Sequence, residues 1–284
     1  MNTTAQELDV LHPALLRAAE VAVAAVNDAR ARLDRDALAA TVGPGADGTP
    51  TMCIDRIVED AILEATPDAN VLTEESGWID RGSAYTLVID PVDGSANAAA
   101  GVPLSAFSGA LAVDGELTQA LTVWNETGWR WWAVRGGPSS GPASVLRTTG
   151  RTSLDGAAVS LLRPHPGNAE ASAAWWRVTR RAARVRILST SCLEAALVST
   201  GATDAFADAC TDTHRLVDLA AAVVLAEAAG GAVRDAFGRP IELDVDLTRR
   251  WSGVVAATPR LADEIAACLA AEQPDHDDEM FTSA

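Results

Sequence analysis

Apolar side chains recur at three- and four-residue intervals near the start of the chain. They are Leu15, Ala19, Ala22 and Val26. This spacing is typical of an amphipathic helix, and Pro13 suits a first helical turn. The sequence therefore predicts a helix from Pro13 to Leu33, followed by a Gly/Pro-rich break at residues 43–50.

A second amphipathic helix is predicted beyond this break, because apolar residues again share one face. They are Ile54, Ile57, Val58, Ala61 and Ile62. Asp55 and Glu59 lie four residues apart and therefore share a different face of the same helix.

Short apolar strands are predicted next, at residues 70–73 and 85–89, and each runs directly into acidic residues. From residue 104 to residue 135 the pattern stays strand-like, with two turn signals, so a β-meander is predicted. Aromatic residues in such a meander typically pack a sheet or a subunit interface. The aromatic residues of this segment include Trp124, Trp129, Trp131 and Trp132.

The rhythm changes after a Gly/Ser/Pro-rich link at residues 136–149, and strands then alternate with helices. The predicted strands are 159–162 and 185–188, and the predicted helices are 193–199 and 218–229. This alternation predicts an α/β half that follows an α+β half. We therefore expect an α+β domain over residues 1–142, an α/β domain over 143–272 and a disordered acidic tail over 273–284.

Composition and charge narrow the possible functions. No apolar run reaches the roughly 18 residues needed to cross a bilayer, and the N-terminus lacks a secretory signal. We therefore expect a cytoplasmic protein with no membrane partner. The formal net charge of −17 argues against general affinity for nucleic acid. The cysteines and histidines form none of the usual metal-binding pairs, so oxygen ligands should hold any metal.

Two aspartates at the end of a buried strand form the most informative segment. Asp90 and Asp93 lie three residues apart in a Pro/Gly turn that can aim both carboxylates at one point. Such carboxylates repel each other unless they are protonated or bridged by cations, so a divalent metal pair is indicated. The backbone N–H groups of Gly94 and Ser95 can then receive a phosphate. An ordinary strand–turn–helix junction, with aspartate as a cap, is the alternative for this segment alone.

Two further acidic elements favour the metal site. Glu74 and Glu75 follow the first of the apolar strands, and Asp218 stands at the predicted start of a helix. Capping of that helix is the alternative role for Asp218, because an acid there is favoured by the helix dipole.

Three segments together resemble the signatures of the inositol monophosphatase superfamily, a group of Mg²⁺-dependent and often lithium-sensitive phosphatases. They occur in the same order and at similar separations, at residues 73–76, 90–97 and 218–231. Two more segments look like the family's first helical motif and its substrate-side segment, at residues 48–59 and 199–206. The resemblance covers roughly residues 48–270 and implies a layered αβαβα sandwich, commonly assembled as a homodimer.

The resemblance implies a role for individual residues. One Mg²⁺ would be held by Glu75, Asp90 and the carbonyl of Val92, and a second by Asp90, Asp93 and Asp218. Ser95 would pair with Asp55 to orient the attacking water, as expected for two-metal hydrolysis. Glu59 and Glu74 would support the site or hold a third metal.

The resemblance also implies a set of substrate-binding residues. It comprises Asp93, Gly94, Ser95, Thr190, Thr211 and Asp212.

The sequence departs from the family pattern around the substrate. Thr211 stands where inositol-specific members have an acidic residue, and Asp208 or Asp212 are the candidates to replace it. We therefore expect hydrolysis of a small phosphorylated metabolite, such as an inositol or sugar phosphate. Histidinol phosphate and a 3′-phosphonucleotide remain alternatives, and so does a catalytically silent relative that binds a metabolite.

Overall fold

The computed structural model describes residues 8–271, and its first sheet is built from the N-terminal half of the chain. The strand order is β4-β3-β5-β6-β7-β8-β9. β3 and β5 are parallel, and the other neighbouring strands are antiparallel. The predicted meander is confirmed as β6, β7 and β8. The strand bounds are β3 Asn70–Thr73, β4 Gly77–Ile79, β5 Tyr85–Asp93, β6 Ala106–Val113, β7 Glu116–Trp124, β8 Arg130–Val134 and β9 Ser139–Ser140.

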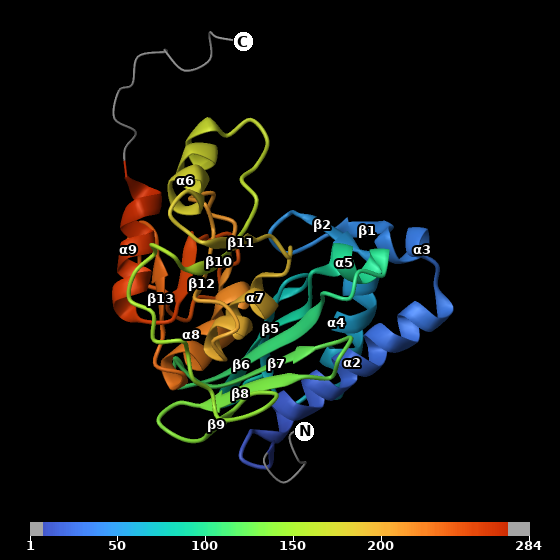
Figure 1. Cartoon of the computed structure of the whole chain (residues 1–284). Helices are drawn as coiled ribbons and strands as arrows, with labels where there is room; N and C mark the ends of the chain where they lie inside the picture. Colours follow the sequence, from blue (N-terminus) through green and yellow to red (C-terminus); the bar gives the residue numbers. More distant parts are fainter. Residues whose placement is uncertain (1–7, 272–284) are drawn as a thin grey trace.

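Two long helices, α2 (Pro13–Arg32) and α4 (Cys53–Ala65), cover the outer face of this sheet (Figure 1). Both were predicted from their apolar spacing, and that spacing accounts for the packing, since the buried positions of each helix point at the strands. A short helix α3 (Arg35–Ala39) and a two-stranded ribbon of β1 (Thr41–Pro44) and β2 (Pro50–Met52) connect them.

The second sheet comes from the C-terminal half and has the order β11-β10-β12-β14-β13. β10 is parallel to β11 and β12, whereas β14 is antiparallel to both of its neighbours. Helices α6 (Ala169–Thr179) and α9 (Pro259–Ala270) form the outermost layer beside it. The strand bounds are β10 Ala158–Leu161, β11 Arg184–Arg186, β12 Ala205–Ala207, β13 Ala232–Asp235 and β14 Gly253–Ala256.

Helices α7 (Ser191–Ser199) and α8 (Leu216–Ala228) lie between the two sheets and contact both. α8 is apolar on all sides, which is the pattern of a helix buried in the centre of a protein. The layers follow as helices, seven-stranded sheet, helices, five-stranded sheet, helices (Figure 1). The predicted αβαβα arrangement of an α/β protein is therefore confirmed.

Three local expectations need comment. β5 does not end at Ile89 but continues to Asp93, so the aspartates belong to the strand and not to a turn after it. β11 ends at Arg186, two residues before the predicted end of that strand. The acidic tail expected over 273–284 lies outside the described residues.

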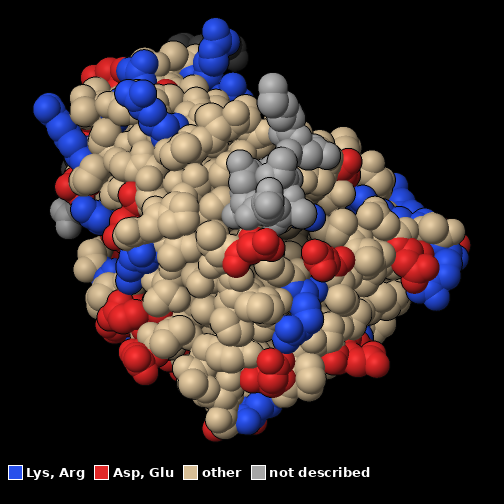
Figure 2. Space-filling view, turned by 90° about the horizontal axis from the view of Figure 1, so that it is seen from below, with Lys and Arg blue, Asp and Glu red and all other residues tan. Residues whose placement is uncertain are grey.

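The surface carries both signs of charge. On the face shown in Figure 2, acidic and basic side chains are interspersed over a mostly uncharged surface. Among residues 8–271, no helix is both long enough and apolar enough to span a membrane.

Candidate active site

The end of β5 presents two buried carboxylates because the strand contains a bulge there. Asp90 pairs with Ser108 of β6 and Asp93 pairs with Ala106, so four residues of β5 oppose three of β6. A bulge bends a strand and turns its side chains toward a new direction. Both aspartates are almost completely buried.

Gly94 is required directly after this bulge. Its φ of +76° lies in the left-handed region, and a Cβ at this position would come within 2.9 Å of the carbonyl oxygen of Leu104. The chain can therefore turn sharply into α5 (Ser95–Ala100), which begins with Ser95.

The carboxylate of Asp93 is anchored by the N-terminus of α7. The backbone N–H groups of Cys192 and Leu193 each donate a 3.0 Å hydrogen bond to Asp93 Oδ2, and the Thr190 hydroxyl donates to the same oxygen. Free N–H groups at a helix N-terminus favour a negative charge. Thr190, predicted to bind substrate, thus holds Asp93 in place and is itself buried.

Asp218 lies in the first turn of α8, where it both caps the helix and faces the other carboxylates. Its Oδ2 accepts a 2.6 Å hydrogen bond from the backbone N–H of Arg215. The Arg215 guanidinium forms ion pairs with Asp218 and Glu74, and a third ion pair with Asp47 at a distance of 3.4 Å. One cation therefore joins carboxylates from three separate segments.

These groups line a cavity of about 380 Å³, to which both halves of the chain contribute. Its carboxylates are Glu74, Asp90, Asp93 and Asp218, and its wall also includes Val92, Gly94 and Ser95. The structure thus brings together predicted residues that are as much as 144 positions apart in the sequence, from Glu74 to Asp218. Ligand atoms of Asp90, Asp93 and Cys192 lie within 4.8 Å of one another, close enough to surround one metal ion.

Glu75, expected as a metal ligand, is not among the residues that line this cavity, whereas the neighbouring Glu74 is. The Glu75 carboxylate accepts a hydrogen bond from the Thr51 hydroxyl. The backbone N–H of Glu75 donates a 3.0 Å hydrogen bond to the Glu59 carboxylate. Both glutamates lie in the turn between β3 and β4, and the turn points only Glu74 inward.

Two predicted substrate residues, Thr211 and Asp212, are also absent from the lining. The Thr211 hydroxyl donates a hydrogen bond to the Asp208 carboxylate, and Asp212 forms a 2.6 Å ion pair with Arg239. Asp212 has a φ of +49°, and the next residue, Thr213, lines the cavity.

Several residues of the cavity wall were not predicted from the sequence. They are Leu162, Arg163, His165, Ser189, Ser191, Thr213, His214 and Arg215. Arg163 and His165 follow β10, so the end of that predicted strand was the available signal. A search for His-x-x-x-His and Cys-x-x-Cys pairs could not identify them, since they are isolated in the sequence.

Burial and mutual repulsion raise the pKa values of these carboxyl groups. Burial, together with the charges of Glu74, Asp93 and Asp218, raises the pKa of Asp90 well above its usual range. Burial also raises the pKa of Asp93 to about 6 and that of Glu74 to about 7. Burial would raise the pKa of Asp218 too, but Arg215 outweighs it and lowers the pKa. A cluster that resists ionisation without a cation is a site for one.

Asp55 lies beside this cluster on α4. Burial and the charges of Glu74 and Glu75 raise the pKa of Asp55 to about 8, although a hydrogen bond with the Ser95 side chain opposes this rise. Burial raises the pKa of the Cys192 thiol as well, so its sulfur is neutral, and the oxygen atoms are the ligands that suit Mg²⁺.

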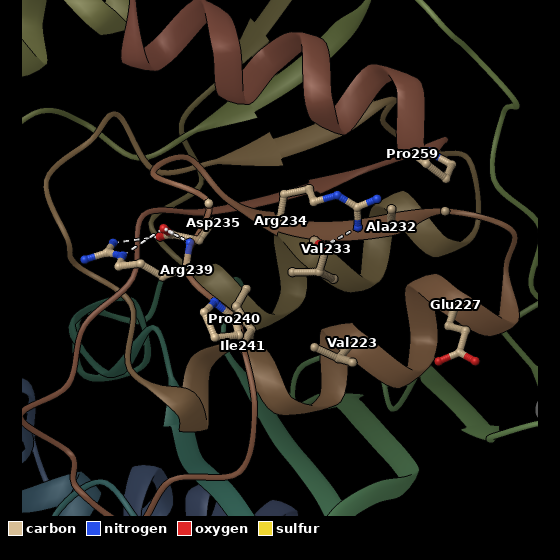
Figure 3. Close-up of a pocket in the computed structure, with 12 residues that line it drawn as sticks. Val223, Glu227, Ala232, Val233, Arg234, Asp235, Arg239, Pro240, Ile241 and Pro259 are labelled. Atoms are coloured by element: carbon tan, nitrogen blue, oxygen red, sulfur yellow. Dashed lines mark hydrogen bonds and ion pairs between the residues drawn. The ribbon is translucent and has the colours of Figure 1, made fainter.

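A larger hollow of about 510 Å³ lies between α8, β13 and the start of α9 (Figure 3). Its charged side chains already have partners, since Arg239 binds Asp235 and Arg234 pairs with Asp263. It contains none of the predicted site residues. Size alone therefore does not identify the site, and the carboxylate-lined cavity is the better candidate.

Comparison with known proteins gives one consistent answer. The sequence profile of the inositol monophosphatase family matches residues 8–276. A fructose-1,6-bisphosphatase/inositol-1-monophosphatase of Thermococcus kodakarensis is 31% identical over 236 residues, which cover 79% of this chain and 84% of that protein. A bifunctional NADP phosphatase/NAD kinase of Methanococcus maripaludis is 29% identical, covering 73% of this chain and 41% of that protein.

Solved structures agree with the sequence comparison. The crystal structure of an inositol monophosphatase–fructose 1,6-bisphosphatase gene product superimposes with a TM-score of 0.77 and 25% identity. The match covers 94% of this chain and all of the other.

Stability of the metal-free protein should fall as the pH rises from about 5 to about 8. In this range the carboxyl groups of Asp55, Glu74 and Asp93 have already lost their protons in the unfolded chain. In the folded protein their pKa values are raised to about 8, 7 and 6, respectively, so they keep their protons up to a higher pH. Since the folded state binds more protons, raising the pH favours unfolding. Thermal unfolding with a chelator at several pH values measures the slope.

Two variants on α4 make this test specific. Asp55→Asn removes one of the raised groups and should make the slope shallower, whereas Asp60→Asn, at an exposed position, should leave it unchanged. A melting temperature that rises with pH in the metal-free wild type would contradict the prediction.

Proposed function

The chain belongs to the inositol monophosphatase family, and from this premise we propose that it hydrolyses a small phosphomonoester with the help of Mg²⁺. The observation that carries the proposal is the cluster of four carboxylates in one cavity, contributed by the β3–β4 turn, β5 and α8. The raised pKa values of three of them support the proposal, because a divalent cation beside these groups would stabilise their ionised forms.

The chain's own residues would hold two Mg²⁺ ions. Glu74, Asp90 and the Val92 carbonyl form one ligand set, and Asp90, Asp93 and Asp218 form the other, so Glu74 replaces Glu75 in the first set. When bound, such ions acidify a water molecule and neutralise charge on the phosphoryl group and leaving oxygen. A third ion is not needed to explain the lining.

Asp55 and Ser95 are suited to orient the water. The Ser95 side chain lies close enough to Asp55 to lower the pKa of its carboxyl group, so the two would act together to hold the water and pass on its proton. The pKa of Asp55, about 8 without metal, would be lowered by nearby cations toward a value suitable for a base. The backbone at Gly94 and Ser95 lines the cavity beside them and is placed to receive a phosphate oxygen.

Arg163 and His165 favour a substrate that carries a second anionic group. They line the cavity that the carboxylates share, and both are exposed. The positive charge of Arg163 at the mouth of a site in a chain of net charge −17 would offset repulsion of an anionic substrate, and His165 adds ring nitrogens that can hydrogen-bond to it. The relatives' names include a fructose-1,6-bisphosphatase and an NADP phosphatase, whose substrates both have further phosphate groups.

Assembly and location follow the family by analogy only. We propose a homodimer in the cytoplasm, with the tryptophans of the meander as the candidate interface. Trp129 is 47% exposed, whereas Trp131 and Trp132 are buried in the sheet, so Trp129 would contribute directly.

The first test is phosphate release across a panel of substrates with and without Mg²⁺. The panel contains inositol, histidinol and sugar phosphates, sugar bisphosphates and 3′-phosphonucleotides. Asp93→Asn should lower Mg²⁺-dependent release roughly 100-fold or more, because it removes a negative ligand while preserving shape. Asp80→Asn, at an exposed turn, is the matched control and should retain full activity. If none of the substrates gives Mg²⁺-dependent phosphate release, the result would favour the alternative of a catalytically silent relative that binds a metabolite.

The second test separates the two glutamates of the β3–β4 turn. Glu74→Gln should lower Mg²⁺-dependent turnover roughly 100-fold, because its carboxylate lines the cavity. Glu75→Gln should cost less than about tenfold, because an amide oxygen still accepts from Thr51. Mg²⁺ titration by calorimetry should show the same order of effects. A larger loss in Glu75→Gln would restore the original ligand assignment.

The third test addresses the second anionic group. Arg163→Gln should raise KM for a sugar bisphosphate by about tenfold and change KM for an inositol or sugar monophosphate by less than about twofold. Arg180→Gln, on a different segment, provides a control for the loss of one positive charge. Equal effects on both substrate types would show that Arg163 acts through general attraction and binds no second group.

A further inference from the structure

The side chain of Arg215 pairs with carboxylates that the metal ions would also need. Its Nη1 atom is paired with Glu74, and its Nε and Nη2 atoms lie 3.2 and 3.4 Å from the two oxygens of Asp218. The Arg215 side chain is only 12% exposed, so water screens these charges weakly. Glu74 belongs to one proposed Mg²⁺ ligand set and Asp218 to the other. A single guanidinium therefore neutralises a ligand from each set.

Asp47 offers the same guanidinium a different partner. Asp47 Oδ2 lies 3.4 Å from Arg215 Nη1 and 2.7 Å from Arg250 Nη2, and the Asp47 side chain is completely buried. Its Oδ1 atom accepts hydrogen bonds from the backbone N–H and the hydroxyl of Thr49, over 2.9 and 2.6 Å, so the carboxylate is held in place. Asp47 does not line the cavity and is in neither proposed ligand set. It can therefore attract Arg215 without occupying a metal ligand.

A guanidinium and a divalent cation that share a carboxylate weaken each other's binding. Arginine keeps its charge at any ordinary pH, so Arg215 cannot lose a proton to make room for an ion. Mg²⁺ bound to Glu74 or Asp218 would have to displace some of the ion pairs of Arg215, and it would repel the guanidinium that remains nearby. The ion pairs that join these segments in the metal-free protein thus oppose metal binding.

We propose that Arg215 sets the Mg²⁺ affinity of the cavity by competing with the ions for Glu74 and Asp218, and that Asp47 limits this competition by attracting the guanidinium. The proposal rests on the proposed Mg²⁺-dependent function. Loss of the Arg215 charge should strengthen Mg²⁺ binding, and loss of the Asp47 charge should weaken it. A residue that only supported the shape of the site would act in the opposite sense to Arg215, because its loss would disperse the ligands.

Calorimetric titration of the protein with Mg²⁺ alone tests the competition. Arg215→Gln should lower the Kd for Mg²⁺ by about tenfold, and Asp47→Asn should raise it by roughly threefold. Because Asp47 acts through Arg215, Asp47→Asn should have little further effect in the Arg215→Gln background, so the two changes should not be additive. Arg180→Gln, at an exposed position, controls for the loss of one positive charge and should leave the Kd unchanged.

Arg215→Lys separates competition by contact from attraction or repulsion at a distance. Lysine keeps the positive charge, but its single ammonium group cannot bridge Glu74 and Asp218 as the planar guanidinium does. The Kd of Arg215→Lys should therefore lie between those of the wild type and Arg215→Gln. A Kd equal to that of the wild type would overturn the proposal, and so would an unchanged or higher Kd in Arg215→Gln.

Thermal unfolding adds a readout that does not depend on turnover. Arg215→Gln should melt at a lower temperature than the wild type in a chelator, since it leaves Glu74 and Asp218 without their cation, and Mg²⁺ should raise its melting temperature by more than that of the wild type. An equal or smaller rise would contradict the competition. If Arg215→Gln does not fold, Arg215→Lys decides the question by the same two measurements.

The proposed function and this proposal can fail separately. Wild-type protein that shows the expected order of Kd values but releases no phosphate would refute hydrolysis and leave the competition intact. Wild-type protein that binds Mg²⁺ and releases phosphate, with the same Kd in Arg215→Gln, would refute the competition alone.

Discussion

The site depends on the electrostatic cost of placing several largely buried carboxylates close together between two sheets. Asp90 and Asp93 come from the bulged end of β5, Asp218 from the first turn of α8 and Glu74 from the β3–β4 turn. Like charges in a medium of low polarity repel strongly, so each group needs a compensating donor or cation. Much of the surrounding architecture supplies that compensation.

The compensation has two sources in the protein itself. The N-terminus of α7 donates two backbone N–H groups to Asp93, and Arg215 joins Glu74, Asp218 and Asp47. Arg250, in the loop before β14, adds a second cation to Asp47 at a distance of 2.7 Å. The turn of the ribbon that carries Asp47 is therefore tied to this loop as well as to the segment before α8. These contacts hold the segments in place, yet they leave the pKa values of Asp90, Asp93 and Glu74 raised. The remaining deficit of positive charge supports the proposed metal site in this cavity.

The layers and most of the carboxylates were predictable because they depend on local patterns. The spacing of apolar residues predicted α2 and α4, and the alternation of strands and helices predicted α8. The end of a strand pointed to Asp90 and Asp93, and the start of a helix pointed to Asp218. The choice between Glu74 and Glu75 was not predictable, since both lie in a three-residue turn between β3 and β4 whose backbone conformation decides which one points inward. The position of Thr211 and Asp212 outside the cavity lining has a related reason. Positive φ angles at Cys210 and Asp212 turn that loop, and the loop presents Thr213 to the cavity.

The isolated residues of the wall show where sequence reasoning reaches its limit. Nothing in the sequence around His214 marks it as part of the cavity wall. The position of its ring depends on a hydrogen bond that the backbone N–H of Gly253, 39 positions later, donates to Nδ1. Arg163 likewise becomes informative only when the loop after β10 is seen beside the carboxylates. The two residues differ in what they can contribute. Arg163 is exposed and offers charge to whatever part of a substrate extends outward, whereas the side chain of His214 is completely buried and helps to shape the wall. Specificity of this enzyme is therefore expected to arise from electrostatic attraction at the mouth of the cavity, because the carboxylates would treat every phosphomonoester alike.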